Sequence, residues 1–310
     1  MEISYAPDLL EEVINMEIKR REEEGDLKLA KEYHSLREPQ YELPLDEDER
    51  EEAFEEVDKK FFAKLSLDTG IKEVLEEFSM INEDVGLMEI MQAYSRDEEN
   101  SNISNKHIET GQKAAIIRLR AQCFFDSASQ KQVIRHECMH LKDILDDTFG
   151  YNRKRFSNNP TEETFIRDRY RAIWDIYIES RLAKEGKESV LGKDDSFKEF
   201  DAIYSKIPEA HRKAIFERLW ERERMTHTEI VELAKDPYKL LQMVEAGQEG
   251  KIKNIVLPGS SCPLCKFPTY KPVQDISSAV KDAIKEDFPN WEDGWWACER
   301  CVDLYSLKTE

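Results

Sequence analysis

The segment Val133–Leu141 carries residues whose types and spacing suit metal chemistry. His136 and His140 are four residues apart, and Glu137 directly follows the first histidine. In a helix, the two imidazoles lie one turn apart on the same face and can hold a single zinc ion. Glu137 is then placed to accept a proton from a zinc-bound water. The motif therefore predicts a zinc-dependent hydrolase in which Glu137 is the catalytic base.

The flanking residues predict a helix that presents these side chains. Residues 129–147 contain neither Gly nor Pro. Apolar and polar positions recur at helical spacing and form two separate stripes. The first stripe is Ile134, Cys138, Leu141 and Leu145, and the second is His136, His140, Asp143 and Asp147. The alternative is a surface helix with two solvated histidines. The chain has only six histidines, which disfavours a chance pairing around a glutamate.

A catalytic zinc also needs a third protein ligand and one open position. The helix-like segment 171–182 supplies two carboxylates four residues apart, Asp175 and Glu179. We favour Glu179 because its side chain is longer and the adjacent Ser180 is small enough to let two helices approach. Asp175 is the alternative, either as the third ligand or as a hydrogen-bond partner of a ligand histidine.

Four cysteines near the C-terminus predict a second metal site. Cys262 and Cys265 form one Cys-x-x-Cys pair, and Cys298 and Cys301 form another, with 32 residues between the pairs. Four thiolates make a closed tetrahedral zinc site, which is structural because no position stays open. The module resembles a zinc ribbon, with a helix inserted at residues 280–288. It is also a candidate surface for a protein partner.

Around the histidine motif, the chain resembles a known group of enzymes. His136-Glu137-x-x-His140 followed by an acidic residue on a second helix is similar to the gluzincin branch of the zincin metallopeptidases, over about residues 110–183. The resemblance implies a sheet, the motif helix and a helix with the third ligand, and it implies peptide-bond hydrolysis. The usual order of glutamate and then aspartate is reversed here, as Asp175 and then Glu179.

Composition restricts the other function classes. Hydrophobic residues make up 40% and charged residues 36% of the chain, and no apolar run is long enough to span a membrane. The first eight residues lack the features of a secretory signal. Paired cysteines of the metal-binding type fit a reducing compartment, so we expect a cytoplasmic protein. The net charge of −20 disfavours nucleic acid as a partner.

These patterns predict an α+β fold with a helix-rich, zincin-like catalytic domain, a small sheet and a C-terminal four-cysteine ribbon. The predicted divisions are an acidic helical region at 1–82, the peptidase domain at 83–250 and the ribbon at 251–310. Strands are expected at 85–94 and 114–125, with a polar loop between them. The resemblance implies that an edge strand at 114–125 holds the substrate as an added strand. An Arg118→Pro change would then impair substrate binding more than zinc content.

The expected activity is hydrolysis of peptide or protein substrates with one catalytic and one structural zinc. Two alternatives stay open. The first is a catalytically silent zincin-like protein that binds or regulates a partner through the ribbon. The second is a DNA-associated protease of the SprT-like kind, which also joins His-Glu-x-x-His to a zinc ribbon. The lack of a nearby third histidine and the charge of −20 both disfavour this second alternative.

Overall fold

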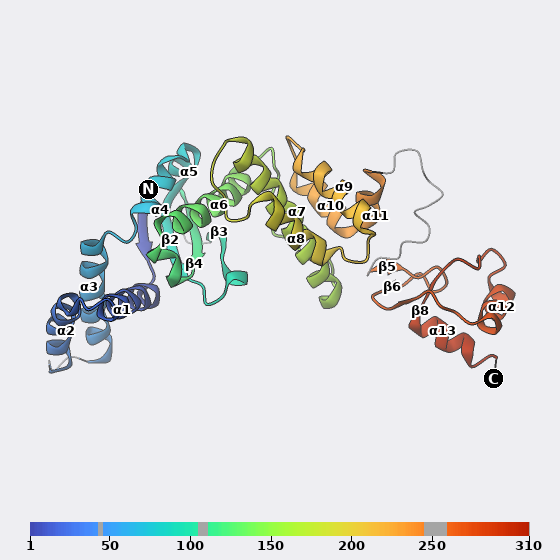
Figure 1. Ribbon diagram of the computed structural model, residues 1–310, viewed down its shortest axis with the longest axis horizontal. Coiled ribbons are helices and arrows are strands. Elements are labelled where there is room, and N and C mark those ends of the chain that lie inside the picture. The colour runs from blue at the N-terminus through green and yellow to red at the C-terminus, as the bar shows by residue number, and fades with distance from the viewer. Residues whose placement is uncertain (43–45, 105–110, 245–258, 310) are drawn as a thin grey trace. The chain divides into compact units, whose positions relative to one another are not determined.

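The computed structural model describes residues 1–42, 46–104, 111–244 and 259–309 (Figure 1). The chain divides into two compact units. The first comprises Met1–Asn152 and Arg181–Val190, and the second comprises Arg153–Ser180 and Leu191–Glu310. The predicted division between residues 250 and 251 lies outside the described residues. No helix in the described part is long and apolar enough to cross a membrane.

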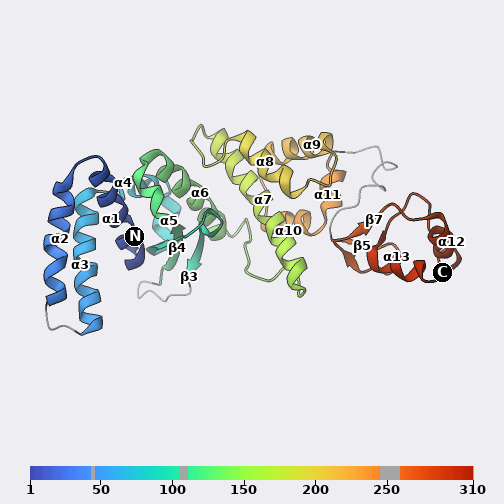
Figure 2. The same ribbon diagram turned by 60° about the horizontal axis from the view of Figure 1, so that its bottom comes forward.

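The first unit begins with a strand and a run of helices. The first helix ends before Gly25, which has φ +88°, in the left-handed region that glycine favours. Asp46 starts the third helix through a reciprocal capping box with Glu49. Helices α2 and α3 lie side by side (Figures 1 and 2). The helices are α1 (Pro7–Glu23), α2 (Leu27–Glu42), α3 (Glu47–Leu65), α4 (Thr69–Glu76) and α5 (Ser79–Asp84).

A four-stranded sheet lies beside these helices, with strand order β1-β2-β4-β3. Strands β1, β2 and β4 are mutually parallel, whereas β3 is antiparallel to β4. Two short 3₁₀ helices, η1 (Arg96–Glu98) and η2 (Ala121–Phe125), follow β2 and β4. The strands are β1 (Glu2–Tyr5), β2 (Val85–Gln92), β3 (Asn100–Ser104) and β4 (Lys113–Leu119).

Two predictions about this sheet are wrong. The strand expected at 114–125 ends at Leu119, because the chain turns into η2 and buries Cys123 and Phe124 there. The stretch expected to be a polar loop contains β3. Its sequence has little intrinsic strand preference, so pairing with β4 determines its conformation.

The strand order also changes the predicted role of Arg118. This residue lies on the interior strand β4, opposite Asn100 of β3 and Met91 of β2. A proline there would remove a backbone donor within the sheet, so Arg118→Pro tests sheet stability rather than substrate binding. The two edges of the sheet are β1 and β3.

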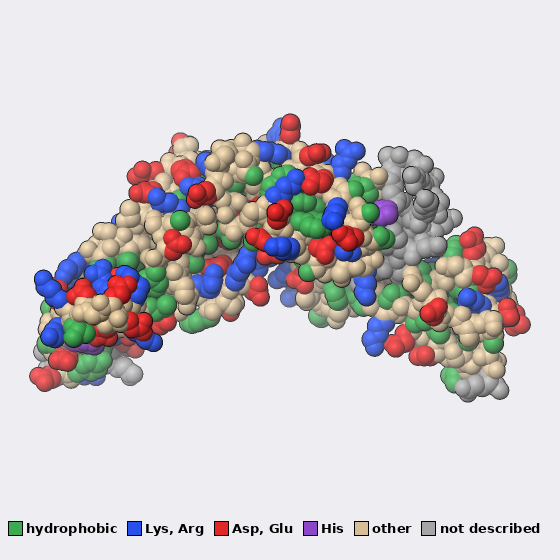
Figure 3. All heavy atoms as spheres, in the orientation of Figure 1, with side chains coloured by type: hydrophobic (Ala, Val, Ile, Leu, Met, Phe, Trp, Pro, Cys, Tyr) green, Lys and Arg blue, Asp and Glu red, His purple; other side chains and the backbone are tan. Residues whose placement is uncertain are grey.

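The surface of the N-terminal region carries both acidic and basic side chains, although acidic residues dominate its composition. Residues 1–60 contain 21 acidic and 9 basic side chains. Figure 3 shows red and blue side chains intermixed over α1–α3. Arg20 and Arg21, for example, both form ion pairs with Glu17, at 2.9 and 2.7 Å. Ion pairs therefore neutralise part of this region locally.

The second unit begins with most of the long helix α7 (Pro160–Lys184) and ends in the cysteine module. A capping box between Thr226 and Glu229 starts α10, and the helix predicted inside the cysteine module is α12. The other helices are α8 (Lys193–Ile203), α9 (Glu209–Trp220), α10 (His227–Lys235), α11 (Pro237–Gln242), α12 (Ser278–Asp287) and α13 (Glu299–Ser306). The short strands are β5 (Ser260–Ser261), β6 (Pro268–Thr269), β7 (Pro272–Val273) and β8 (Ala297–Cys298).

The polar sequence around His227 predicts an exposed side chain, but the residue is buried. The residue is 3% exposed, and its Nδ1 lies 2.8 Å from the Tyr170 hydroxyl. Burial disfavours the charged imidazolium and lowers the pKa of His227. The polar sequence around it gave no sign of this, because the aromatic ring that covers it comes from α7.

The buried His227 predicts an acid-sensitive second unit. The unfolded chain binds a proton at this histidine as the pH falls below about 6.5, whereas the folded protein does so only at lower pH. Unfolding free energy should therefore fall between pH 7.5 and 5.5, and this part of the loss should vanish in His227→Gln. Urea unfolding followed by tryptophan fluorescence at both pH values measures it. Equal pH dependence in the two proteins would contradict the prediction.

Candidate metal sites

The histidine motif lies on helix α6 (Ser127–Leu145), as its periodicity predicts. The Asp126 side chain caps the helix by accepting a hydrogen bond from the Ala128 backbone N–H at 3.0 Å. The predicted apolar stripe is buried, with Ile134, Cys138 and Leu141 at 0% exposure. Helix α6 packs against α4, α5 and β3 of the first unit. The core therefore fixes the rotation of the helix and, with it, the face that carries the histidines.

The two histidines of the motif lie together. The Nε2 atoms of His136 and His140 are 3.1 Å apart, with the rings edge to face. Zinc–nitrogen bonds of 2.0–2.1 Å in a tetrahedral site place two nitrogens roughly 3.3 Å apart. The observed separation is thus close to that of two ligands of one ion, and the pair fits a metal.

Glu137 directly follows His136 in the chain and is 4% exposed. Its backbone carbonyl accepts a hydrogen bond from the Ser101 hydroxyl at 2.9 Å, which ties the motif helix to the edge strand β3. The carboxylate Oε2 of Glu137 is buried and has no hydrogen-bond partner among the described residues. Buried acceptors normally have a donor, so this oxygen suits a water molecule or a substrate group.

A candidate third ligand lies on α7. A carboxylate oxygen of Asp175 and the ring nitrogens of His136 and His140 all lie within 4.8 Å of one another. Arg171, one turn earlier on α7, lies 3.8 Å from the Asp175 carboxylate. Glu179, the carboxylate that the sequence favoured, lies one turn further along α7 and is fully buried. Of the two alternatives, Asp175 is the one found in this three-residue group.

The last turn of α7 is held to α6 by an ion pair that the sequence did not reveal. Arg181 donates two hydrogen bonds to Asp143, at 2.8 and 2.6 Å, and Asp143 is 4% exposed. Asp143 follows His140 by three residues, and Arg181 follows Glu179 by two. That spacing is the only sequence signal, and many solvated helices share it. The pair connects the two helices that carry the candidate ligands.

Breaking this ion pair should destabilise the protein strongly. An Arg181→Met change leaves the Asp143 carboxylate buried without its cation, which costs about 3–5 kcal/mol. The double change Arg181→Met with Asp143→Leu removes both charges and should recover most of that loss. Urea unfolding curves of the three proteins test this. If the Arg181→Met protein is as stable as the wild type, groups other than Arg181 stabilise the Asp143 carboxylate.

The four C-terminal cysteines also lie together. The Sγ atoms of Cys262 and Cys301 are 3.9 Å apart, and those of Cys265 and Cys298 are 3.7 Å apart. All four sulfurs lie within 4.8 Å of one another. Tetrahedral zinc with Zn–S bonds of 2.3 Å gives sulfur separations of roughly 3.8 Å, whereas a disulfide needs about 2.05 Å. The cluster therefore fits a four-thiolate metal site.

The local backbone supports an ionised sulfur at one member of this cluster, Cys262. Burial by itself would raise the pKa of the Cys262 thiol. Backbone N–H groups of Cys298, Cys265 and Leu264 outweigh that effect, so its pKa is lowered. One of these donors, the Cys298 N–H, lies 3.3 Å from the Cys262 sulfur. Two short antiparallel pairs, β5 with β6 and β7 with β8, frame the site, an arrangement compatible with a zinc ribbon.

No family model, curated protein or solved structure matches this chain. A functional assignment therefore rests on the two groups of side chains that could bind a metal, the histidine group and the cysteine cluster.

Proposed function

We propose that this protein is a zinc-dependent peptidase with a separate structural zinc. The observation that carries the proposal is the 3.1 Å approach of the two Nε2 atoms on α6, where the buried Glu137 directly follows the first histidine in the chain. A structural metal site needs four closed ligands, as the cysteine cluster offers. The histidine group offers three protein ligands instead and leaves a fourth position for a reacting molecule.

His136, His140 and Asp175 would hold the catalytic zinc. Asp175 is the better supported third ligand because its carboxylate reaches both imidazoles, whereas Glu179 is the alternative one turn away. Bound zinc would act as a Lewis acid, polarising the peptide carbonyl and lowering the pKa of a bound water. Glu137 would accept the proton of the attacking water and later deliver it to the leaving amine.

The edge strand β3 would bind the substrate backbone. The hydrogen bond from Ser101 to the Glu137 carbonyl places this edge strand directly against the motif helix. A peptide that adds to β3 would be held through its main chain, which gives affinity with little dependence on sequence. This role replaces the one expected for residues 114–125. We therefore expect an unfolded polypeptide to be a better substrate than a compact protein.

Hydrolysis of an unfolded, fluorescently labelled protein tests the proposal. The full-length protein should release labelled peptides, lose this activity after treatment with a zinc chelator and regain it when zinc is restored. Mass spectrometry of the products would give the cleaved bonds. A protein that carries zinc at both sites and releases no peptides from several unfolded substrates would contradict the proposal. It would favour the non-catalytic binding protein instead.

A further inference from the structure

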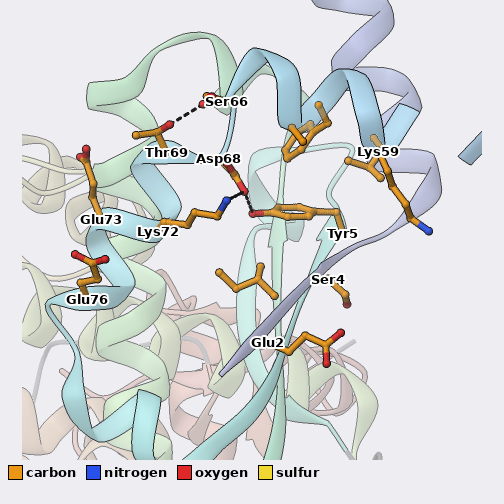
Figure 4. A pocket seen from close by; sticks show the side chains of 14 residues that line it. Glu2, Ser4, Tyr5, Lys59, Ser66, Asp68, Thr69, Lys72, Glu73 and Glu76 are labelled. Carbon is orange, nitrogen blue, oxygen red and sulfur yellow. Dashed lines mark hydrogen bonds and ion pairs between the residues drawn. The ribbon is translucent and has the colours of Figure 1, made fainter. Parts of the chain in front are cut away.

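A groove lies in the first unit, along the edge strand β1. It has a volume of about 650 Å³. Strand β1 forms one wall, and the end of α3, the α3–α4 connection and α4 form the other (Figure 4). Nothing in the proposed peptidase chemistry uses this groove. The sheet thus has one edge beside the motif helix and one edge that lines a separate cavity.

The backbone of β1 offers hydrogen bonds to this groove. The Ala6 N–H donates to the Ile90 carbonyl of β2 at 2.9 Å. In a parallel ladder, alternate residues of an edge strand face the neighbouring strand, so the peptide groups of Ile3 and Tyr5 face away from β2. Such outward N–H and C=O groups are a template for another strand. The groove therefore has the backbone chemistry needed to hold an extended peptide.

The two walls of the groove are joined at one end by a polar contact. The Tyr5 hydroxyl donates to Asp68 Oδ2 at 3.0 Å, and Lys72 Nζ lies 2.7 Å from the same oxygen (Figure 4). Asp68 is 7% exposed. Because this contact holds β1 against the start of α4, the groove is already formed. A peptide entering a formed groove pays less ordering entropy than one that must create it.

The charges around the groove favour a cationic occupant. Each of its two lysines forms an ion pair with a carboxylate: Lys59 lies 2.7 Å from Glu55, and Lys72 contacts Asp68. The groove also has three further glutamates, of which Glu73 is paired with Lys131. The other two, Glu2 and Glu76, are exposed and have no ion pair among the described residues. The groove thus carries a surplus of negative charge.

We propose that the β1 edge binds an extended lysine- or arginine-rich peptide segment as an additional strand. Main-chain groups of Ile3 and Tyr5 would pair with the peptide backbone, and Glu2 and Glu76 would contact its cationic side chains. The site lies three strand spacings from β3, which is roughly 14 Å. Peptide binding at the β1 edge does not depend on the proposed hydrolysis. The Glu137→Gln protein, which is expected to lack hydrolysis, should therefore bind the peptide as the wild type does.

Fluorescence anisotropy with a labelled nine-residue peptide of alternating lysine and valine tests the proposal. The full-length Glu137→Gln protein should bind it, and more weakly as salt rises. Reversing two charges, in Glu2→Lys with Glu76→Lys, should weaken binding about tenfold. The matched control Glu12→Lys with Glu23→Lys makes the same charge change on exposed positions of α1 outside the groove. It should leave the affinity within about twofold.

Hydrogen exchange then locates the peptide. Binding should slow exchange of the Ile3 and Tyr5 amides and leave the β3 amides unchanged. Equal weakening by both charge-reversed proteins, or equal binding of a glutamate–valine peptide, would overturn the proposal in favour of non-specific attraction. Protection at β3 alone would overturn it by placing the peptide at the other edge. A complete lack of binding by the lysine–valine peptide would also overturn it.

Discussion

The Glu137→Gln protein is expected to keep both zinc ions and to lose peptide hydrolysis by about 10³-fold, within the range for removal of a general base. Glutamine has nearly the same shape as glutamate, so α6 and its two histidines should stay in place. It cannot accept the proton of the attacking water, because its amide is not basic. The rate of peptide release from an unfolded substrate and the zinc content of the same sample measure both effects.

The same substitution at an exposed position gives the control. Glu83→Gln changes an exposed side chain at the end of α5 and should alter neither zinc content nor turnover. A Glu137→Gln protein that cleaves substrate at the wild-type rate would exclude Glu137 as the base. Loss of zinc in this variant would show instead that the Glu137 carboxylate helps to hold the metal.

The Cys262→Ser protein is expected to lose one zinc and the folded structure of its C-terminal module. The module is short and its core is small, so metal binding provides most of its folding free energy, on the order of 10 kcal/mol. Trp291 and Trp296, which are 3% and 6% exposed, should become solvated. We expect a red-shifted tryptophan emission and rapid proteolysis after residue 258. The histidine group on α6 should keep its zinc.

Cys123→Ala is the matched control for this change. Cys123 is also a buried cysteine, but it lies in η2 next to Glu99 and far from the cluster in sequence. Its replacement should leave the zinc content and the protease resistance of the C-terminal module unchanged. If Cys262→Ser retains both zinc ions and its tryptophan emission, the four sulfurs do not form a metal site that stabilises the module.

Local spacing was sufficient to predict the parts of both sites that lie on one short segment. His136, Glu137 and His140 share one helix, so the 3.6-residue period alone brings the two imidazoles together. Each Cys-x-x-Cys pair is likewise a local motif. The apolar stripe of α6 was predictable for the same reason, because hydrophobic residues at helical spacing must face a core.

Local spacing could not predict the features that depend on contacts between segments distant in the sequence. The sequence favoured Glu179 over Asp175 because its side chain is longer, whereas the three-residue group contains Asp175. Strand β3 escaped prediction because its polar sequence becomes a strand only through pairing with β4. His227 is buried by Tyr170, which is 57 residues away in the chain. In each case the decisive neighbour is remote in sequence.

Zinc stoichiometry by native mass spectrometry tests the central claim most directly, with the wild type measured beside Asp175→Ala. We predict two zinc ions in the wild type and one in the variant, because the histidine pair loses its third ligand while the four cysteines keep theirs. Two zinc ions in both proteins would transfer the ligand role to Glu179. A single zinc in the wild type that disappears in Cys262→Ser would leave α6 without a metal and contradict the peptidase proposal.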